Sequence, residues 1–159
     1  MAEKLIPLED AQSIVLSHVA PTNLVEIPVW QAAGFPLAED AVADIDISPF
    51  ANSAMDGYAV RSADLAQASG ETPVTLDVIG HEAAGHVFEG ALGPGETVRI
   101  MTGAPVPEGA DAVVKYEIVE VLDGDGNEGS HVRFSAPAKV GENVRSAAEE
   151  AHAGDVVIH

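Results

Sequence analysis

The chain has 159 residues, enough for one ordinary hydrophobic core or two small ones but too few for a large multidomain enzyme. Its 26 acidic and 7 basic residues give a formal net charge of −19, a field that repels nucleic acid and anionic membrane surfaces. The absence of cysteine excludes disulfides, thiolate catalysis and zinc sites built on sulfur, so any metal must be held by oxygen or imidazole.

Two further patterns bear on the class of protein. No apolar run approaches the roughly 20 residues that a membrane-spanning helix needs, and the N-terminus lacks the pattern of a secretion signal. We therefore expect a soluble, cytoplasmic protein that binds neither nucleic acid nor membranes. The acidic charge is equally consistent with a solubility adaptation that has no functional meaning.

Two helices are predicted near the N-terminus. Apolar residues recur at helical spacing from Pro7 to Ala20, with acidic residues in the first turn and Pro21 as the terminator. A second, shorter helix is predicted over 29–33, between a proline that suits a helix start and a glycine that suits a helix exit.

Strand patterns follow, because apolar and polar residues alternate as they do in half-exposed strands. The predicted strands are 42–47, 74–78, 97–100, 113–122 and 132–134, and the last is the return partner of the one before it. Turn sequences occupy 93–95 and 123–127, and a final apolar run covers 156–158. We predict an α+β fold in which the helical or extended ends flank a β-rich middle, which is an inserted domain if the two ends pack together.

Three short motifs suggest ligand sites but have better structural explanations. His81 and His86 are five residues apart, about 140° around a helix, so they cannot share the face that a zinc-protease pair needs. The zinc alcohol dehydrogenase pattern also needs cysteines, so a strand that ends in a glycine-rich turn explains residues 80–86. Residues 123–134 match parts of a dinucleotide motif and of a calcium loop, but a hairpin turn explains both matches.

Two segments carry a more specific signal. The first, Pro49 to Val60 (PFANSAMDGYAV), is a loop-like run of small and polar residues that places a carboxylate beside a glycine and then enters a strand. The second, Arg99 to Val114 (RIMTGAPVPEGADAVV), is a strand that breaks into a stiff Pro/Gly loop before another strand begins. Rigid loops mounted on a sheet are where binding and catalytic sites are usually built.

Together with GENVR at 141–145, these segments resemble the molybdopterin molybdenumtransferase family, which includes the C-terminal part of gephyrin. The resemblance covers nearly the whole chain, yet family members are much longer. It implies that the N-terminal and linker regions are present, without the phosphate-binding α/β domain and the C-terminal β-barrel. On this basis residues 1–48 and 138–159 form a discontinuous dimerisation domain, and residues 49–137 form a β-rich linker domain that carries both loops.

The resemblance implies a homodimeric transferase of molybdenum cofactor biosynthesis. Such an enzyme takes adenylylated molybdopterin and molybdate, cleaves the adenylate with the help of Mg²⁺, and inserts molybdenum into the pterin. The cleft would lie between the linker domain of one subunit and the phosphate-binding domain of the other. Asp56 would be a catalytic residue and metal ligand, since hard cations prefer oxygen ligands. Thr102 would supply a catalytic hydroxyl, and Asn52, Ser53 and Glu150 would bind substrate or hold the loop.

Structural explanations compete for two of these residues. Asp-Gly is an ordinary turn pair, so Asp56 could cap its own loop, and the hydroxyl of Thr102 could bond the backbone at a strand end. Three departures from the family pattern bear on activity. Ala51 stands where an acidic residue is expected, Glu150 replaces an aspartate, and Ala148 replaces a glycine whose backbone freedom alanine lacks.

Three functional hypotheses follow. The leading one is a fragment of a molybdenum-insertion enzyme that dimerises and contributes one wall of the active site. We expect it to be catalytically inactive alone, since seven basic residues offer little to hold a phosphate and a molybdate. The alternative is a stand-alone dimerisation or scaffold module without catalysis, which a natural gene ending at His159 would favour. A weaker hypothesis is an independent metal-binding protein that uses Asp56 and nearby carboxylates, which calorimetry with Mg²⁺ would detect.

Overall fold

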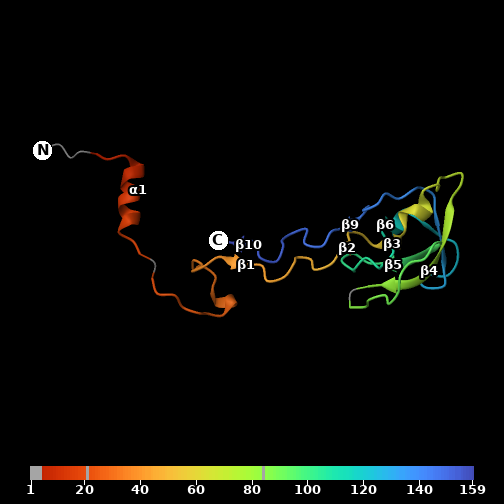
Figure 1. The fold of residues 1–159 in the computed structure, drawn as a ribbon, viewed down its shortest axis with the longest axis horizontal. Helices are drawn as coiled ribbons and strands as arrows, with labels where there is room; N and C mark the ends of the chain where they lie inside the picture. Colours follow the sequence, from red (N-terminus) through yellow and green to blue (C-terminus); the bar gives the residue numbers. More distant parts are fainter. Residues whose placement is uncertain (1–4, 21, 84) are drawn as a thin grey trace. The chain divides into compact units, whose positions relative to one another are not determined.

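The computed structural model describes residues 5–20, 22–83 and 85–159, which belong to two units. The first unit comprises the described residues up to Asp40 together with His159, and the second comprises residues 41–158. The described residues contain one α-helix, whereas ten strands carry most of the regular structure. The predicted α+β fold, with a helical or extended domain and an inserted β-rich domain, is therefore wrong, because the chain is mainly β-sheet (Figure 1).

The helix α1 (Leu8–Ser17) is shorter than the sequence pattern predicts. The carbonyl oxygen of Ile14, which would accept the next helical hydrogen bond, lies 2.7 Å from the Ser17 hydroxyl and 2.8 Å from Nδ1 of His18. These two side chains satisfy the hydrogen-bonding capacity of the Ile14 carbonyl, so the helix can end there without a further turn. Pro21, the predicted terminator, lies outside the described residues.

The second predicted helix, over 29–33, is only a 3₁₀ turn, η1 (Val29–Gln31). No residue of α1 or η1 is buried. Most of the stability of short helices comes from packing of an apolar face, so the short segment around η1 has little to stabilise an α-helix.

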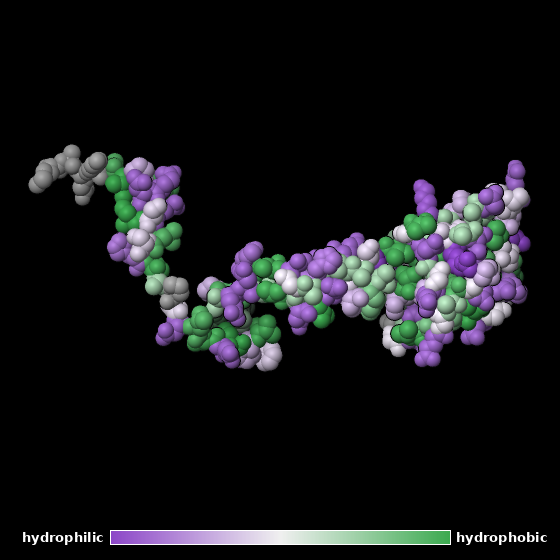
Figure 2. All heavy atoms as spheres, in the orientation of Figure 1, coloured by the Kyte–Doolittle hydropathy of each residue, from purple (hydrophilic) through white to green (hydrophobic). Residues whose placement is uncertain are grey.

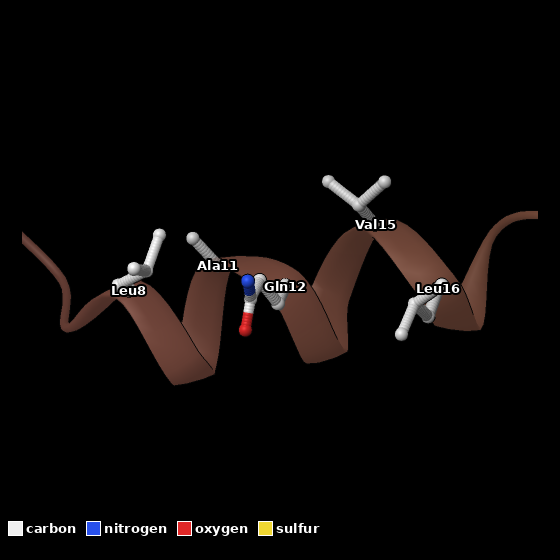
Figure 3. Close-up of a pocket in the computed structure, with 5 residues that line it drawn as sticks. All are labelled: Leu8, Ala11, Gln12, Val15 and Leu16. Carbon is white, nitrogen blue, oxygen red and sulfur yellow. The ribbon is translucent and has the colours of Figure 1, made fainter.

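The apolar side of α1 is uncovered. Leu8, Ala11, Val15 and Leu16 line a shallow groove along the helix with Gln12 (Figure 3). Figure 2 shows hydrophobic residues at the surface of this unit, both on α1 and in the loops that follow it. An uncovered apolar helix face is typical of a surface that packs against a partner. No helix in the described part of the chain has the length and apolar character that a bilayer crossing requires.

The second unit is built on a six-stranded, strongly curled sheet (Figure 1). The strand order is β6, β3, β5, β4, β8, β7, and all neighbours are antiparallel except β4 and β5, which are parallel. The strands are β3 (Gly57–Val60), β4 (Val74–Glu82), β5 (Glu96–Ile100), β6 (Ala112–Lys115), β7 (Glu120–Val121) and β8 (His131–Phe134). The alternating patterns at 74–78, 97–100 and 132–134 thus lie in strands, as predicted.

The prediction of one long strand over 113–122 is wrong. Its first part is β6, its last part is β7, and a 3₁₀ turn, η3 (Tyr116–Ile118), separates them. The reason is topological, since β6 and β7 lie at opposite edges of the sheet and the chain must cross from one edge to the other. The predicted pairing with 132–134 is confirmed only for β7.

The sheet buries apolar side chains on both faces. One cluster is centred on Tyr58 and Phe134 and includes Leu65 of a 3₁₀ turn, η2 (Ser62–Leu65). The other cluster consists of Ala59, Ile100, Ala104 and Val113. Successive residues of β3 therefore enter different clusters, as the two-residue period of a strand requires.

Two structural explanations of the misleading motifs are confirmed. The turn at 123–127 joins β7 to β8 as a hairpin, and β4 ends at Glu82 before a tight turn in which Gly85 has a φ of 79°.

The hairpin is stabilised by Asp123, whose carboxylate accepts the main-chain N–H of His131 at 2.7 Å. This hydrogen bond and a second one from the His131 ring lower the pKa of Asp123.

A narrow ribbon of two chain segments completes the second unit. The strands β1 (Ala41–Val42) and β10 (Val156–Ile158) pair, and main-chain hydrogen bonds continue from Ala43 to Asp155 and from Ile47 to Ala151, both at 2.9 Å. The strand predicted over 42–47 is thus regular only at its start. The predicted domain boundaries, at 48/49 and 137/138, stay a prediction.

Candidate functional site

The two loops that the sequence singles out meet at one end of the sheet. The Asp56 loop (residues 51–57) contains β2 (Asn52–Ser53), which pairs with β9 (Val144–Arg145), and it leads into β3. The Thr102 loop (residues 101–107) follows β5. The main-chain N–H of Ser53 donates to the Ala104 carbonyl at 2.9 Å, and that of Gly103 donates to the Ser53 carbonyl at 2.8 Å. In Figure 1 the labels of β2, β3, β5, β6 and β9 lie together at this end.

Asp56 and Thr102 form the centre of the site. The Asp56 oxygen Oδ1 accepts the main-chain N–H of Thr102 at 2.8 Å and the Thr102 hydroxyl at 2.7 Å. The other oxygen, Oδ2, has no hydrogen-bond partner within the residues that the structure describes. Both side chains are exposed. Thr102 therefore fixes the orientation of the carboxylate and leaves one oxygen open to a ligand.

These contacts also keep Asp56 ionised. The main-chain hydrogen bond from Thr102 lowers the pKa of the Asp56 carboxyl most, the Thr102 hydroxyl and the charge of Arg99 lower it further, and desolvation opposes them. Hydrogen bonds to the charged form favour that form. Asp56 is thus suited to act as an anion, either as a metal ligand or as a hydrogen-bond acceptor that orients water.

We predict that Thr102→Val raises the pKa of Asp56 but leaves it below the ordinary value. The substitution removes the hydroxyl donor, whereas the main-chain N–H, the larger cause, remains. The measurement is an NMR titration of the Asp56 carboxyl carbon. The pKa of Asp125, which Asn127 lowers, is the internal control and should not change. An unchanged Asp56 pKa would contradict the role of the hydroxyl.

The sign of this effect on stability follows from linkage. A carboxyl with a depressed pKa in the folded state stabilises the fold above its unfolded-state pKa, and this stabilisation is lost as the pH falls through the folded-state pKa. Thr102→Val should therefore reduce the part of the acid-induced destabilisation that Asp56 contributes.

Asn52 and Ser53 are buried, with 7% and 0% of their surfaces exposed. The amide of Asn52 donates to the Ser48 hydroxyl at 3.2 Å, and the Ser53 hydroxyl donates to the Met55 carbonyl at 2.5 Å. The Ser53 side chain thus bonds within the Asp56 loop, whereas the Asn52 side chain bonds the segment that precedes it. They hold the Asp56 loop in place, and a direct contact with substrate stays a prediction.

Glu150 lies in the ribbon instead of at the Asp56 loop. Its main-chain N–H donates to the Ile47 carbonyl at 3.0 Å, and its side chain is exposed. No hydrogen bond or ion pair within the described ranges joins it to Asp56 or Thr102. The neighbouring departure, Ala148, has a φ of 57°, so alanine stands in a left-handed position that favours glycine.

Asn143, which the sequence reasoning missed, fastens the Asp56 loop to the edge of the sheet. Its carbonyl accepts the N–H of Ala54 at 2.9 Å, and its side-chain amide donates to the Val113 carbonyl at 2.8 Å. Asn143 has a φ of 54°, which asparagine tolerates better than most residues. The signal that could have revealed it is its place in GENVR, one of the three matched motifs.

Arg99 and Tyr116 flank the site and were also missed. The guanidinium carbon of Arg99 lies 5.0 Å from the centre of the Tyr116 ring, which suits a cation–π contact. The main-chain N–H of Tyr116 donates to the Asp56 carbonyl at 3.0 Å. Tyr116 thus contacts both the Arg99 side chain and the backbone of Asp56.

No group of three or more histidine, aspartate or glutamate side chains in the described residues could hold a metal ion. Asp56 offers one open carboxylate oxygen. Magnesium is often bound by only one or two carboxylates, with water and substrate phosphates as its other ligands. Asp56 could therefore supply one ligand to such an ion, while the described residues form no closed metal site.

Comparisons with known proteins give a consistent result. Residues 6–159 match the family model described as MoeA N-terminal region (domain I and II). The molybdopterin molybdenumtransferase of Bacillus subtilis is 44% identical over 122 residues, 77% of this chain and 28% of the relative. That of Haemophilus influenzae is 39% identical over 155 residues, 97% of this chain and 36% of the relative. The chain thus spans about a third of the length of these curated relatives.

Solved structures show the same fold. A crystal structure of the molybdopterin biosynthesis moeA protein from Pyrococcus horikoshii OT3 matches with a TM-score of 0.85 at 32% identity, covering 98% of this chain and 40% of that one. A second crystal structure of the Pyrococcus moeA protein matches with a TM-score of 0.76 at 36% identity, covering 98% of this chain and 38% of that one.

Proposed function

Since this chain belongs to the MoeA family, whose N-terminal region it matches, we propose that it forms one wall of the active site of a molybdopterin molybdenumtransferase. The complete enzyme would insert molybdenum from molybdate into adenylylated molybdopterin, in the biosynthesis of the molybdenum cofactor. The observation that carries the proposal is the ionised, outward-facing carboxylate of Asp56, fixed by two hydrogen bonds from Thr102.

In this proposal Asp56 and Thr102 have different roles. Asp56 would touch the reacting groups, either by binding Mg²⁺ through Oδ2 or by orienting water. The Thr102 hydroxyl is engaged with Asp56, so Thr102 would act through the carboxylate as a positioning residue. Bound Mg²⁺ would supply a Lewis acid for the phosphate oxygens of the adenylate. The chain's own part in the chemistry would be to hold and orient one ligand oxygen.

We propose that the wall is inactive by itself. The remaining phosphate contacts would come from a phosphate-binding domain of the partner subunit, which the family architecture predicts. A chain with 26 acidic and 7 basic residues offers few groups for a phosphate and a molybdate together. We also expect the complete enzyme to work in the cytoplasm.

The direct test joins this chain to the remaining domains of the Bacillus subtilis relative and measures molybdate-dependent release of AMP from adenylylated molybdopterin. Turnover by the folded hybrid would support an active-site wall. A folded but inert hybrid would favour the alternative, a dimerisation or scaffold module without catalysis.

The proposed homodimer is supported by the uncovered apolar face of α1. We expect the chain to sediment as a dimer and Leu16→Asp to sediment as a monomer, because a charge in an apolar interface costs its desolvation. Ser13→Asp, on the same helix but outside the groove, is the matched control and should stay dimeric. We expect a dimer Kd below about 0.1 mM, and an unmodified chain that is still a monomer at that concentration would contradict the proposed dimer.

A further inference from the structure

Arg99 is a cation without an ion-pair partner within the described residues of a strongly acidic chain. In the described part of the chain its guanidinium forms no ion pair, whereas Arg61 and Arg133 both do. Its Nη1 donates to the main-chain oxygen of Asp125 and to the side-chain oxygen of Asn127, both at 3.3 Å. Both acceptors are neutral groups, although the nearby Asp125 carboxylate has a pKa that is lowered by hydrogen bonds from Asn127 and also by the charge of Arg99.

The guanidinium is also held in a fixed orientation, and some of its N–H donors make no hydrogen bond within the described residues. It stacks over the Tyr116 ring at 5.0 Å, and Tyr116 in turn stacks against Tyr58 with ring centres 6.1 Å apart. A guanidinium carries five N–H donors, and the hydrogen bonds within the described residues use only those on Nη1. The donors on Nε and Nη2 thus remain open, and Arg99 is only half-buried.

Arg99 lies near the Asp56 site, and Tyr116 links the two residues. Arg99 precedes Thr102 by three residues, and its stacking partner Tyr116 donates its main-chain N–H to the Asp56 carbonyl. The charge of Arg99 is one of the causes that lower the pKa of Asp56. No ion pair joins the two side chains across the described residues, so both remain available to a ligand.

We propose that Arg99 binds a tetrahedral oxyanion at the edge of the Asp56 site through its Nε and Nη2 donors. A planar guanidinium matches such oxygens in a bidentate manner, and charge-assisted hydrogen bonds of this kind are stronger than neutral ones. The inference rests on the proposed function, in which the oxyanion is a phosphate of the adenylylated pterin or molybdate itself. A local cation is needed because a net charge of −19 repels anions at longer range.

The test uses this chain and does not require turnover. Inorganic phosphate and molybdate are titrated separately at constant low ionic strength, and the NMR signal of the Arg99 Nε–H group is followed. We expect a saturable shift, and about tenfold weaker binding in Arg99→Gln, since a charge-assisted pair is lost. Arg133→Gln is the matched control, because Arg133 is already paired with Glu120 at 3.0 Å.

Two further variants separate ligand binding from a structural role. Asn127→Ala removes an acceptor that orients Arg99 but keeps the guanidinium, so it should still bind the anion. Arg99→Lys keeps the charge but loses the planar fork, so its binding should weaken. It replaces Arg99→Gln if that variant does not fold.

The outcomes decide the proposal. A saturable shift with phosphate, with molybdate or with both supports it and identifies which oxyanion Arg99 receives. No saturable shift with either anion, equal binding by Arg99→Gln in a folded protein, or an equal loss in Arg133→Gln overturns it. A hybrid enzyme that turns over while Arg99 shows no saturable shift would overturn this inference alone. Saturable binding by a chain whose hybrid is inert would instead remove only the proposed enzymatic role.

Discussion

Asp56→Ala should lower the molybdate-dependent release of AMP by the hybrid enzyme about 100-fold or more, the usual scale for loss of a positioned acid–base group or metal ligand. The two Thr102 hydrogen bonds would lose their acceptor, and the open oxygen Oδ2 would be lost with it. The measurement is steady-state AMP release by the native and substituted hybrids at equal concentration, with circular dichroism to check folding.

Asp123→Ala is the matched control for that experiment. Asp123 is also exposed and also has a pKa lowered by hydrogen bonds, but its partner is His131 in the β7–β8 hairpin. We expect the control hybrid to keep the native rate. If Asp56→Ala and the native hybrid are equally active, the catalytic assignment of Asp56 is wrong and the site must be sought elsewhere.

The second large effect concerns the glycine that follows Asp56. A Cβ on Gly57 would overlap the carbonyl oxygen of Val114 and would lie 3.1 Å from Cα of Lys115, both part of the backbone of β6. Backbone cannot rotate aside as a flexible side chain can, so β3 and β6 would have to separate. We expect Gly57→Ala to lower the free energy of unfolding by about 3 kcal/mol, the upper part of the range for overpacked sites. Urea unfolding followed by circular dichroism measures the change.

Gly70→Ala controls for the general effect of adding a methyl group to a glycine. A Cβ at Gly70 would meet nothing within 4 Å, and Gly70 does not have a positive φ. Its unfolding free energy should therefore change by less than about 1 kcal/mol. Equal stabilities for the two alanine variants would show that β3 and β6 are not packed as tightly as the structure indicates.

The fold could be predicted from the sequence only where local periodicity determines the structure. Local periodicity predicted α1, β4, β5 and β8, because side-chain alternation and helical spacing are encoded within a few residues. It failed for 113–122, where two strands and the turn between them form one continuous apolar pattern. Only the positions of β6 and β7 at opposite edges of the sheet reveal the break, and edge positions depend on the whole chain.

The candidate site could likewise be predicted only in part. Motif resemblance identified Asp56 and Thr102, and the structure brings them within hydrogen-bond distance across 46 residues of sequence. Motif resemblance also assigned Glu150 to substrate binding; Glu150 lies in the ribbon, where its main-chain N–H donates to the Ile47 carbonyl, and its role stays a prediction. The contacts of Arg99 and Tyr116 could not be predicted, since they join segments whose pairing only the folded sheet defines, whereas the GENVR motif pointed to Asn143 without revealing its partners.

The β1–β10 pair has a consequence for how such a unit can be moved between proteins. Ala41 is paired directly with Ile158, so the chain enters and leaves the second unit at neighbouring points, about 5 Å apart in an antiparallel pair. A host protein could accept residues 41–158 within a single surface loop, because joining ends that already lie together adds little loop-closure entropy. The same closeness would allow circular permutation, in which a short linker joins 158 to 41 and new termini are opened in an exposed loop such as 70–73.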